Sequence, residues 1–343
     1  MRAWRILRSV WQQEFGQGLV LGALAMVVIL GFTAMAIDVG IFLHERRDLQ
    51  NAADAAALAG VAELPGSPAE AEAKVHEWAD KNGIDIAGGE LEPVAITTTY
   101  VTNDTVRVQV TRETPFVFGR VLGLTSGTMQ ADATARVGSP SWGSNVMPWA
   151  LRKSAQEGVT YDTEVTLKYS AQDSSSGDYG SLALGGLTGA ATYYDNILNG
   201  AETCIGCVEQ TEPGNIVGKT EVGLQDRLES NNPLCENFGD VFAVVGDGWR
   251  FANDVCNPWE EEGADSKRVV LIPVIDDPDG GRDEVTIIRF ALVFLTNEFS
   301  DDICPTGLEC DVKAIFVKVY DDIGMLIGPY DPGSDIRFAR LVE

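Results

Sequence analysis

The side chains that could do chemistry in this chain are mainly carboxylates, because histidine is almost absent. The sequence holds 51 acidic residues but only two histidines, His44 and His76. A Ser-His-Asp or Cys-His catalytic group needs a histidine, and residues 147–343 contain none. A carboxylate pair that hydrolyses glycosides stays open, because the sequence does not show how far apart the acidic residues lie. We expect a protein without catalytic residues.

One group of these carboxylates has the composition of a calcium site. Asp277, Asp279 and Asp283 lie close together, with Gly280 and Gly281 between them, on the expected connection between two strands. Calcium binds several carboxylate and carbonyl oxygens on flexible loops of this kind. The Pro-Asp-Gly-Gly segment is also that of an ordinary hairpin turn whose charges face water, and we favour this interpretation. We expect no other cofactor.

A single carboxylate, Asp38, stands at the end of an apolar run of 19 residues from Leu19 to Ile37. A helix of that length spans about 28 Å, which is enough to cross the hydrocarbon core of a bilayer. The run is too long for the apolar core of a cleaved signal peptide, so we expect a retained anchor over residues 19–43. One interpretation of Asp38 is functional, because a carboxylate inside a membrane is by default a functional group. In that case Asp38 would pair with a cation of a neighbouring subunit. We favour the interpretation that the helix carries Asp38 to the wet interface.

Charge around the apolar run predicts its orientation. Arg2, Arg5 and Arg8 precede the run with only Glu14 against them, whereas the other flank has mixed charge. Basic residues stay in the cytoplasm. We therefore expect a single-pass protein of the cytoplasmic membrane, with residues 1–18 inside and the bulk of the chain periplasmic or extracellular.

All six cysteines lie in the segment expected outside the membrane. An even number in an exported segment predicts disulfide bonds rather than reduced thiols. A zinc site that used Cys204 and Cys207 lacks histidine support, and a redox Cys-x-x-Cys lacks a thioredoxin-like strand and helix around it. Many pairings are possible, but short separations suggest three local pairs: Cys204–Cys207, Cys235–Cys256 and Cys304–Cys310.

The charge balance excludes one class of partner. The net charge is -26, and residues 147–343 hold 14 basic against 35 acidic side chains. Such a chain is repelled by nucleic acid and by anionic lipid head groups, and no basic patch with interleaved aromatic residues occurs. We expect no nucleic acid partner.

The anchor helix is expected to continue to about Leu64 and to carry small side chains on one face. These residues recur at three- and four-residue spacing, so another element or a partner helix can pack closely there: Leu49, Ala52, Ala53, Ala56 and Gly60. Alternating patterns and turn residues then predict a small α+β module over residues 44–138. Its further elements are a helix at 69–82, strands at 94–101 and 105–111, a short helix at 116–124 and a strand at 128–137.

The rest of the chain is expected to form a second domain. Residues 139–146 are rich in serine, proline and glycine and are predicted as a linker. Residues 147–343 follow as an acidic, β-rich domain with the disulfides. Strands are expected at 164–169, 268–275, 285–295, 312–320 and 336–342, and helices at 190–198 and 219–229.

One segment closely resembles the N-terminal segment of TadG-like proteins of Flp (tight adherence) pilus systems: residues 16–60, GQGLVLGALAMVVILGFTAMAIDVGIFLHERRDLQNAADAAALAG. The resemblance continues through WADKNG, TPFVFGRVLGL and MQADATARV, which begin at Trp78, Thr114 and Met129. It implies an α+β fold in which a transmembrane helix continues into a small pilin-like module, followed by the β-rich domain. It also implies pilin or pilus assembly subunits as partners.

Two features of that group are not expected here. Some members carry a von Willebrand A domain with an Asp-x-Ser-x-Ser metal site, but the nearest string, Asp173 to Gly177, ends in glycine. Prepilin-type cleavage requires a glutamate where this chain has Leu21 or Ala23. We expect a non-enzymatic anchored component that acts in pilus assembly or surface attachment through helix packing. The alternative is an anchored extracytoplasmic enzyme or calcium-dependent binding module that uses the helix only as a tether.

Overall fold

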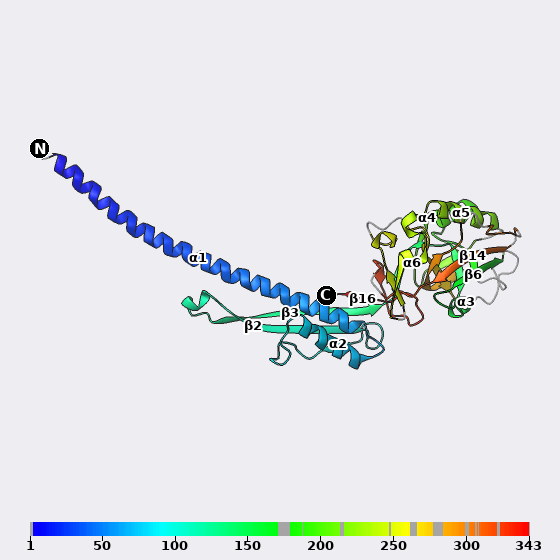
Figure 1. Ribbon diagram of the computed structural model, residues 1–343, viewed down its shortest axis with the longest axis horizontal. Coiled ribbons are helices and arrows are strands. Elements are labelled where there is room, and N and C mark those ends of the chain that lie inside the picture. The colour runs from blue at the N-terminus through cyan, green and yellow to red at the C-terminus, as the bar shows by residue number, and fades with distance from the viewer. Residues whose placement is uncertain are drawn as a thin grey trace.

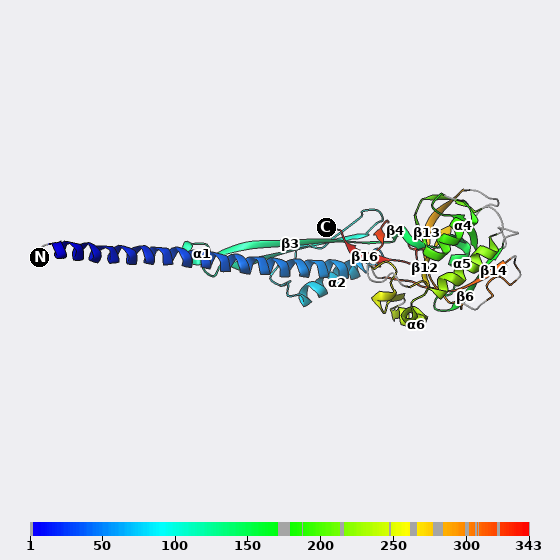
Figure 2. The same ribbon diagram turned by 90° about the horizontal axis from the view of Figure 1, so that it is seen from above.

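The computed structural model describes residues 3–342, except 171–178, 187, 213–215, 247, 261–265, 277–283, 299–301, 306, 308 and 321–322. The molecule is elongated (Figure 1). A long helix, α1, projects from one end, a narrow sheet lies along its second half, and a rounded unit forms the other end. Figure 2 shows the same arrangement from above, with strand β3 beside α1. The α+β fold class predicted from the sequence is confirmed.

Helix α1 runs from Ala3 to Val61 over 59 residues and changes its surroundings along its length. Its first part contains a window of mean hydropathy 2.5 that no other part of the protein buries, and this part is long and apolar enough to cross a membrane. From Leu49 onward one face is buried. Turns follow α1 up to Gly66, and α2 then spans Pro68–Lys81, although the Ser67 side chain makes no capping hydrogen bond.

A four-stranded antiparallel sheet covers the second half of α1, in the order β1-β2-β3-β16. Its strands are β1 Ala95–Thr97, β2 Thr105–Pro115, β3 Ser126–Gly138 and β16 Phe338–Leu341. Val106, Val108 and Val110 alternate with polar residues in β2, and all three are buried against the helices. The predicted hairpin between β1 and β2 is therefore present, and a longer hairpin of β2 and β3 dominates the sheet.

The short helix predicted at residues 116–124 is not formed. These residues make the loop at the tip of the β2–β3 hairpin, with one 3-10 turn, η1, at Gly119–Leu122. We call residues 116–124 the hairpin tip. The turn ends at Gly123, which adopts the left-handed conformation with φ 85°, so a regular helix does not continue beyond Leu122.

A second unit is built on a ten-stranded sheet whose pairings close on themselves, because β12 also pairs with β13 and β7 with β9. Closure leaves fewer exposed strand edges. Alternate residues of β12 belong to two hydrophobic clusters, with Val270, Ile272 and Val274 in one and Val269, Leu271 and Ile275 in the other. The strands are β4 Pro140–Val146, β5 Trp149–Arg152, β6 Glu164–Ser170, β7 Tyr179–Ala183, β8 Ala201–Cys204, β9 Val208–Thr211, β12 Val269–Ile275, β13 Glu284–Leu295, β14 Glu309–Phe316 and β15 Leu326–Ile327.

Helices and a small hairpin surround this sheet. Helices α4 Ala190–Asn199 and α5 Val217–Glu229 pack on each other and correspond to the two predicted helical stretches. The other elements are α3 Lys153–Glu157, η2 Pro233–Cys235, α6 Phe238–Val241, strands β10 Phe242–Val245 and β11 Gly248–Phe251, and η3 Asp254–Cys256.

The predicted linker at 139–146 is wrong, because residues 140–146 form β4 within the large sheet. A Cβ on Gly143 would lie 2.9 Å from Leu271 Cδ1 and 3.1 Å from Phe290 Cζ, so glycine serves close packing here. The last predicted strand also changes place, since β16 pairs with β3. We therefore distinguish a helix–hairpin module, made of α1 from residue 44, α2, β1, β2, β3 and β16, from a distal unit of residues 140–337.

The two parts meet at a short junction. Ser139 is buried, and its N–H donates to the carbonyl of Pro329 at 3.4 Å. The Arg337 guanidinium donates to the carbonyls of Ala62, at the end of α1, and Leu64. The distal unit is therefore joined to the module by the chain at Ser139, by β16 and by Arg337.

Candidate functional site on the anchor helix and the hairpin tip

The small-residue face of α1 is covered by the chain's own elements. Leu49, Ala52, Ala53 and Ala56 are buried in one cluster with residues of α2, β2 and β3. A Cβ on Gly60 would lie 2.5 Å from Val75 Cγ2, so α2 approaches the helix backbone at this position. This face is therefore used inside the module and is not open to a partner helix.

Asp38 lies in a setting that neither sequence interpretation anticipated. It is only 6% exposed and accepts hydrogen bonds from three consecutive backbone N–H groups of the hairpin tip. The distances are 2.9 Å to Val117 N, 3.1 Å to Phe118 N and 2.6 Å to Gly119 N. Asp38 therefore holds the tip onto the helix. Its placement at the wet interface and its pairing with a cation of a neighbouring subunit stay predictions.

An aromatic contact one helical turn further along α1 fixes the same loop. The rings of Phe42 and Phe116 stack at 4.6 Å between centroids, with 11° between their planes. A Cβ on Gly127 would lie 2.7 Å from Phe42 Cε1, so the glycine leaves room for the ring. Asp38 and Phe42, four residues apart on one face of the helix, together clamp the tip.

The surface around this clamp is almost entirely apolar. A groove of about 640 Å³ runs between the exposed part of α1 and the tip. The groove is lined by residues of the helix, Asp38 among them, and by residues of the tip. The lining consists of Val28, Gly31, Phe32, Ala34, Met35, Asp38 and Val39 from α1 and Phe116, Phe118, Gly119, Val121 and Leu124 from the tip.

A second, polar cavity of about 280 Å³ lies in the distal unit near the junction. Its buried group is Asp335, which accepts hydrogen bonds from Tyr161 Oη at 2.6 Å and Gln156 Nε2 at 2.9 Å. Burial raises the pKa of Asp335 to about 7. Arg289 and Lys318 also line the cavity, and Arg289 Nε lies 3.0 Å from Asp331 Oδ2. No sequence pattern singled out these residues, because they come from separate segments.

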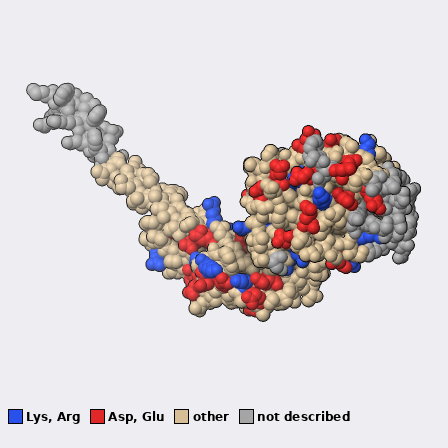
Figure 3. All heavy atoms as spheres, turned by 45° about the vertical axis from the view of Figure 1, so that its right-hand side comes forward, with Lys and Arg blue, Asp and Glu red and all other residues tan. Residues whose placement is uncertain are grey.

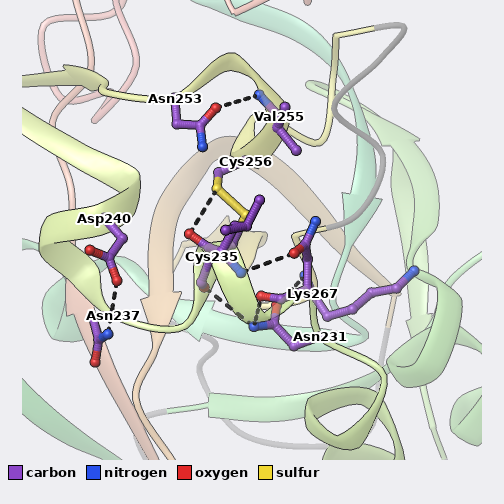
Figure 4. The surroundings of a disulfide bond; sticks show 10 residues. Asn231, Cys235, Asn237, Asp240, Asn253, Val255, Cys256 and Lys267 are labelled. Carbon is purple, nitrogen blue, oxygen red and sulfur yellow. Dashed lines mark hydrogen bonds between the residues drawn. A yellow bond between two sulfur atoms is a disulfide. The ribbon is translucent and has the colours of Figure 1, made fainter.

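The six cysteines form three disulfides in the distal unit, between Cys204 and Cys207, Cys235 and Cys256, and Cys304 and Cys310. These are the local pairs suggested by the spacing. Figure 4 shows the surroundings of the Cys235–Cys256 bond, where Asn231 and Asn253 hydrogen-bond to the flanking backbone. Both sulfurs are buried, so this bond ties two short 3-10 turns into the interior.

The predicted metal residues Asp277, Asp279 and Asp283 lie outside the described residues, as does the string from Asp173 to Gly177. Among the residues that the structure describes, no three His, Cys, Asp or Glu side chains are grouped so as to hold a metal ion. The calcium interpretation stays a prediction.

Surface charge separates the two ends of the molecule. Figure 3 shows acidic side chains spread over the visible face of the distal unit, with fewer Lys and Arg among them. The described part of the projecting helix appears without charged side chains in the same view, which agrees with the uncharged run from Leu19 to Ile37. An acidic body at the end of an apolar helix is suited to water on one side and lipid on the other.

Comparisons with known proteins identify the first part of the chain. A family model described as putative Flp pilus-assembly TadE/G-like matches residues 16–63, and one described as putative Tad-like Flp pilus-assembly matches residues 44–135. Neither a curated protein nor a solved structure matches this chain. The matched residues comprise the apolar part of α1, the clamp, the tip and nearly all of the β2–β3 hairpin. The first part of the chain therefore carries Flp pilus-assembly domains, TadE/G-like over residues 16–63 and Tad-like over residues 44–135.

Proposed function

We propose that this chain is a non-enzymatic, membrane-anchored component of a Flp (tight adherence) pilus system, and that α1 packs laterally on pilin or pilus assembly subunits. Residues 1–18 lie in the cytoplasm, and the helix–hairpin module and distal unit lie on the other side of the membrane. The basic residues before the span support this orientation, and the three disulfides support an exported body.

The observation that carries the proposal is the exposure of α1 within the segment that the TadE/G-like model matches. The apolar side chains of this segment are open, whereas the alanine face further along is already occupied. Gly18 and Gly22 lie one helical turn apart, and a Cβ on either would meet nothing within 4 Å. Packing within this chain therefore does not require these glycines, and small residues at this spacing let two membrane helices approach closely.

Crosslinking from two neighbouring alanines tests the contact. Ala25 shares the helix face of Gly18 and Gly22, whereas Ala23 lies roughly 200° away from Ala25 around the helix. Both are exposed. A photoreactive residue at position 25 in cells is expected to capture a pilin or pilus assembly subunit, and the same residue at position 23 is expected to capture far less. Capture of no pilus subunit from either position would contradict the proposal.

A deep acidic cleft or a bound metal in the distal unit would favour the alternative, an anchored enzyme or calcium-dependent binding module. The described cavity around Asp335 is instead lined by Arg289, Lys318 and Arg337 as well as by carboxylates. We therefore keep the assembly role as the single proposed function.

A further inference from the structure

The hairpin tip exposes apolar side chains where the end of a β-hairpin is ordinarily polar. Val121 is 88% exposed, and Val117, Phe118 and Leu124 also face outward. The tip carries one charged side chain, Arg120, which is exposed. An exposed apolar cluster of this kind marks a contact with a partner protein or a membrane, because apolar side chains are unfavourable in water.

The position of the tip along α1 shows at which depth it lies. Its groove is shared with Val28, Phe32 and Met35, all of which belong to the apolar run from Leu19 to Ile37. Val28 is the middle residue of that run, and from Val28 to Asp38 a helix rises about 15 Å, or about half of the hydrocarbon core. If the run spans the bilayer, the groove side of the tip lies within the hydrocarbon.

The backbone of the tip is prepared for such surroundings. In lipid, every N–H group needs an internal acceptor, and irregular loops normally fail this condition. Asp38 accepts from the N–H groups of Val117, Phe118 and Gly119. Further N–H groups donate to nearby carbonyls at 3.0 to 3.1 Å: Phe116 to Thr125, Val121 to Phe118, Gly123 to Arg120 and Leu124 to Gly119. Asp38 and nearby carbonyls thus provide internal acceptors for most N–H groups of the tip, as a loop in lipid requires.

We propose that the hairpin tip, residues 116–124, inserts into the leaflet on the side of the folded domains and that lipid acyl chains fill the groove between it and α1. The inference rests on the anchor of the proposed function and adds a second membrane contact to it. Arg120 reaches the phosphate groups of the lipids with its guanidinium while its methylenes stay among the acyl chains. The acidic distal unit stays away from the bilayer because it is held at the other end of the module.

Quenching by lipid nitroxides tests this insertion in the full-length protein. Every native cysteine is in a disulfide, so a new cysteine gives a single labelling site for an environment-sensitive fluorophore. Three exposed valines provide matched positions: Val121 in the tip, Val27 in the span, which is 68% exposed, and Val244 in the distal unit, which is 70% exposed. The variants V121C, V27C and V244C are reconstituted in phosphatidylcholine vesicles, with or without nitroxide-labelled acyl chains.

We expect nitroxide lipids to reduce the emission of the labels at positions 121 and 27 and to leave the label at position 244 unchanged. If position 121 behaves like 244 while position 27 is quenched, the tip inference is wrong and the anchor stands. If position 27 is not quenched either, the anchor fails and the proposed function fails with it. If position 121 is unquenched in vesicles but shielded from iodide in native membranes, a protein partner covers the tip and the lipid proposal is overturned.

Discussion

The helix–hairpin module and the distal unit are stabilised in different ways. In the module, alanines and valines bring α1 close to the β2–β3 hairpin. The hydrophobic cluster of the module contains no fully buried aromatic residue and no disulfide. The described distal unit buries Trp149, Phe290 and Phe294 and contains three disulfides and a fully buried arginine. A long helix can follow a hairpin closely only where side chains are small, whereas a rounded unit with many loops depends on local ties. Changes in one part should therefore leave the stability of the other part largely unaltered.

The largest effect is expected at Arg227, which is buried without an ion-pair partner among the described contacts. Its guanidinium donates to four oxygens: Lys267 O at 2.6 Å, Asn145 Oδ1 at 2.6 Å, Ile197 O at 2.9 Å and Leu198 O at 3.1 Å. Arg227→Met leaves buried acceptors unpaired and should lower the free energy of unfolding of the distal unit by about 3 to 5 kcal/mol. Urea unfolding followed separately in each part measures this, with exposed Arg250→Met as the control. Equal destabilisation of the module would break the comparison.

The Cys235–Cys256 disulfide should have the next largest effect, because it closes the longest loop of the three. Its cysteines are 21 residues apart, against 6 for Cys304–Cys310. Loop-closure entropy predicts a loss of about 3 kcal/mol when Cys235 and Cys256 are both replaced by alanine, and about 2 kcal/mol for the shorter loop. Thermal unfolding of the two double variants tests the order, and non-reducing peptide mapping verifies the bonds. A larger loss from the shorter loop would show that loop length does not control stability here.

Overpacking the small-residue face sharpens the comparison from the side of the module. Ala56→Leu adds bulk where α1 meets the hairpin and should cost about 1 to 3 kcal/mol. Ala73→Leu on the exposed face of α2 is the matched control and should have little effect. Hydrogen exchange of β2 and β3 reports the loss locally. Unchanged exchange in the Ala56 variant would mean that the face tolerates larger residues and does not set the helix–hairpin distance.

The last prediction concerns Asp335 and the pH dependence of the stability of the distal unit. Its pKa is about 7 in the folded protein and near 3.8 in the unfolded chain, because burial penalises the charged form. Between about pH 4 and pH 7 the folded state keeps a proton that the unfolded state releases, so this group lowers stability as pH rises, by up to about 1.4 kcal/mol per pH unit. Asp335→Asn should remove that contribution, and exposed Asp195→Asn should not. Unfolding measured across this range would contradict the assignment if wild type and Asp335→Asn differed by a constant amount.

Sequence patterns predicted the elements whose signal is local. The alternating valines Val106, Val108 and Val110 identified β2, and the apolar run from Leu19 to Ile37 identified the exposed part of α1. The short spacing of the cysteines also suggested the pairs that the structure contains. In each of these cases the partners lie close in the sequence or share one period, so the pattern itself carries the information.

Features that depend on distant pairing could not be predicted in this way. The partners of Asp38 are about 80 residues away, and nothing near Asp38 indicates that a loop will return to it. Residues 139–146 look like a linker because glycine and serine permit flexibility, but the same small size allows Gly143 to pack beneath Leu271 and Phe290. A strand over residues 336–342 was predicted, but nothing in its sequence indicated that it would pair with β3 rather than with the large sheet.

The return of β16 to β3 has a mechanical consequence. The chain leaves the module at Gly138 and comes back at Phe338, and these two residues are paired neighbours. The distal unit is thus connected to the module through two adjacent strands rather than through a single flexible segment. Arg337 supports this connection by donating hydrogen bonds to the backbone that follows α1. A sideways force on the distal unit is transmitted as a bending load to the membrane helix, and a single backbone cut at residue 139 leaves the unit attached through β16.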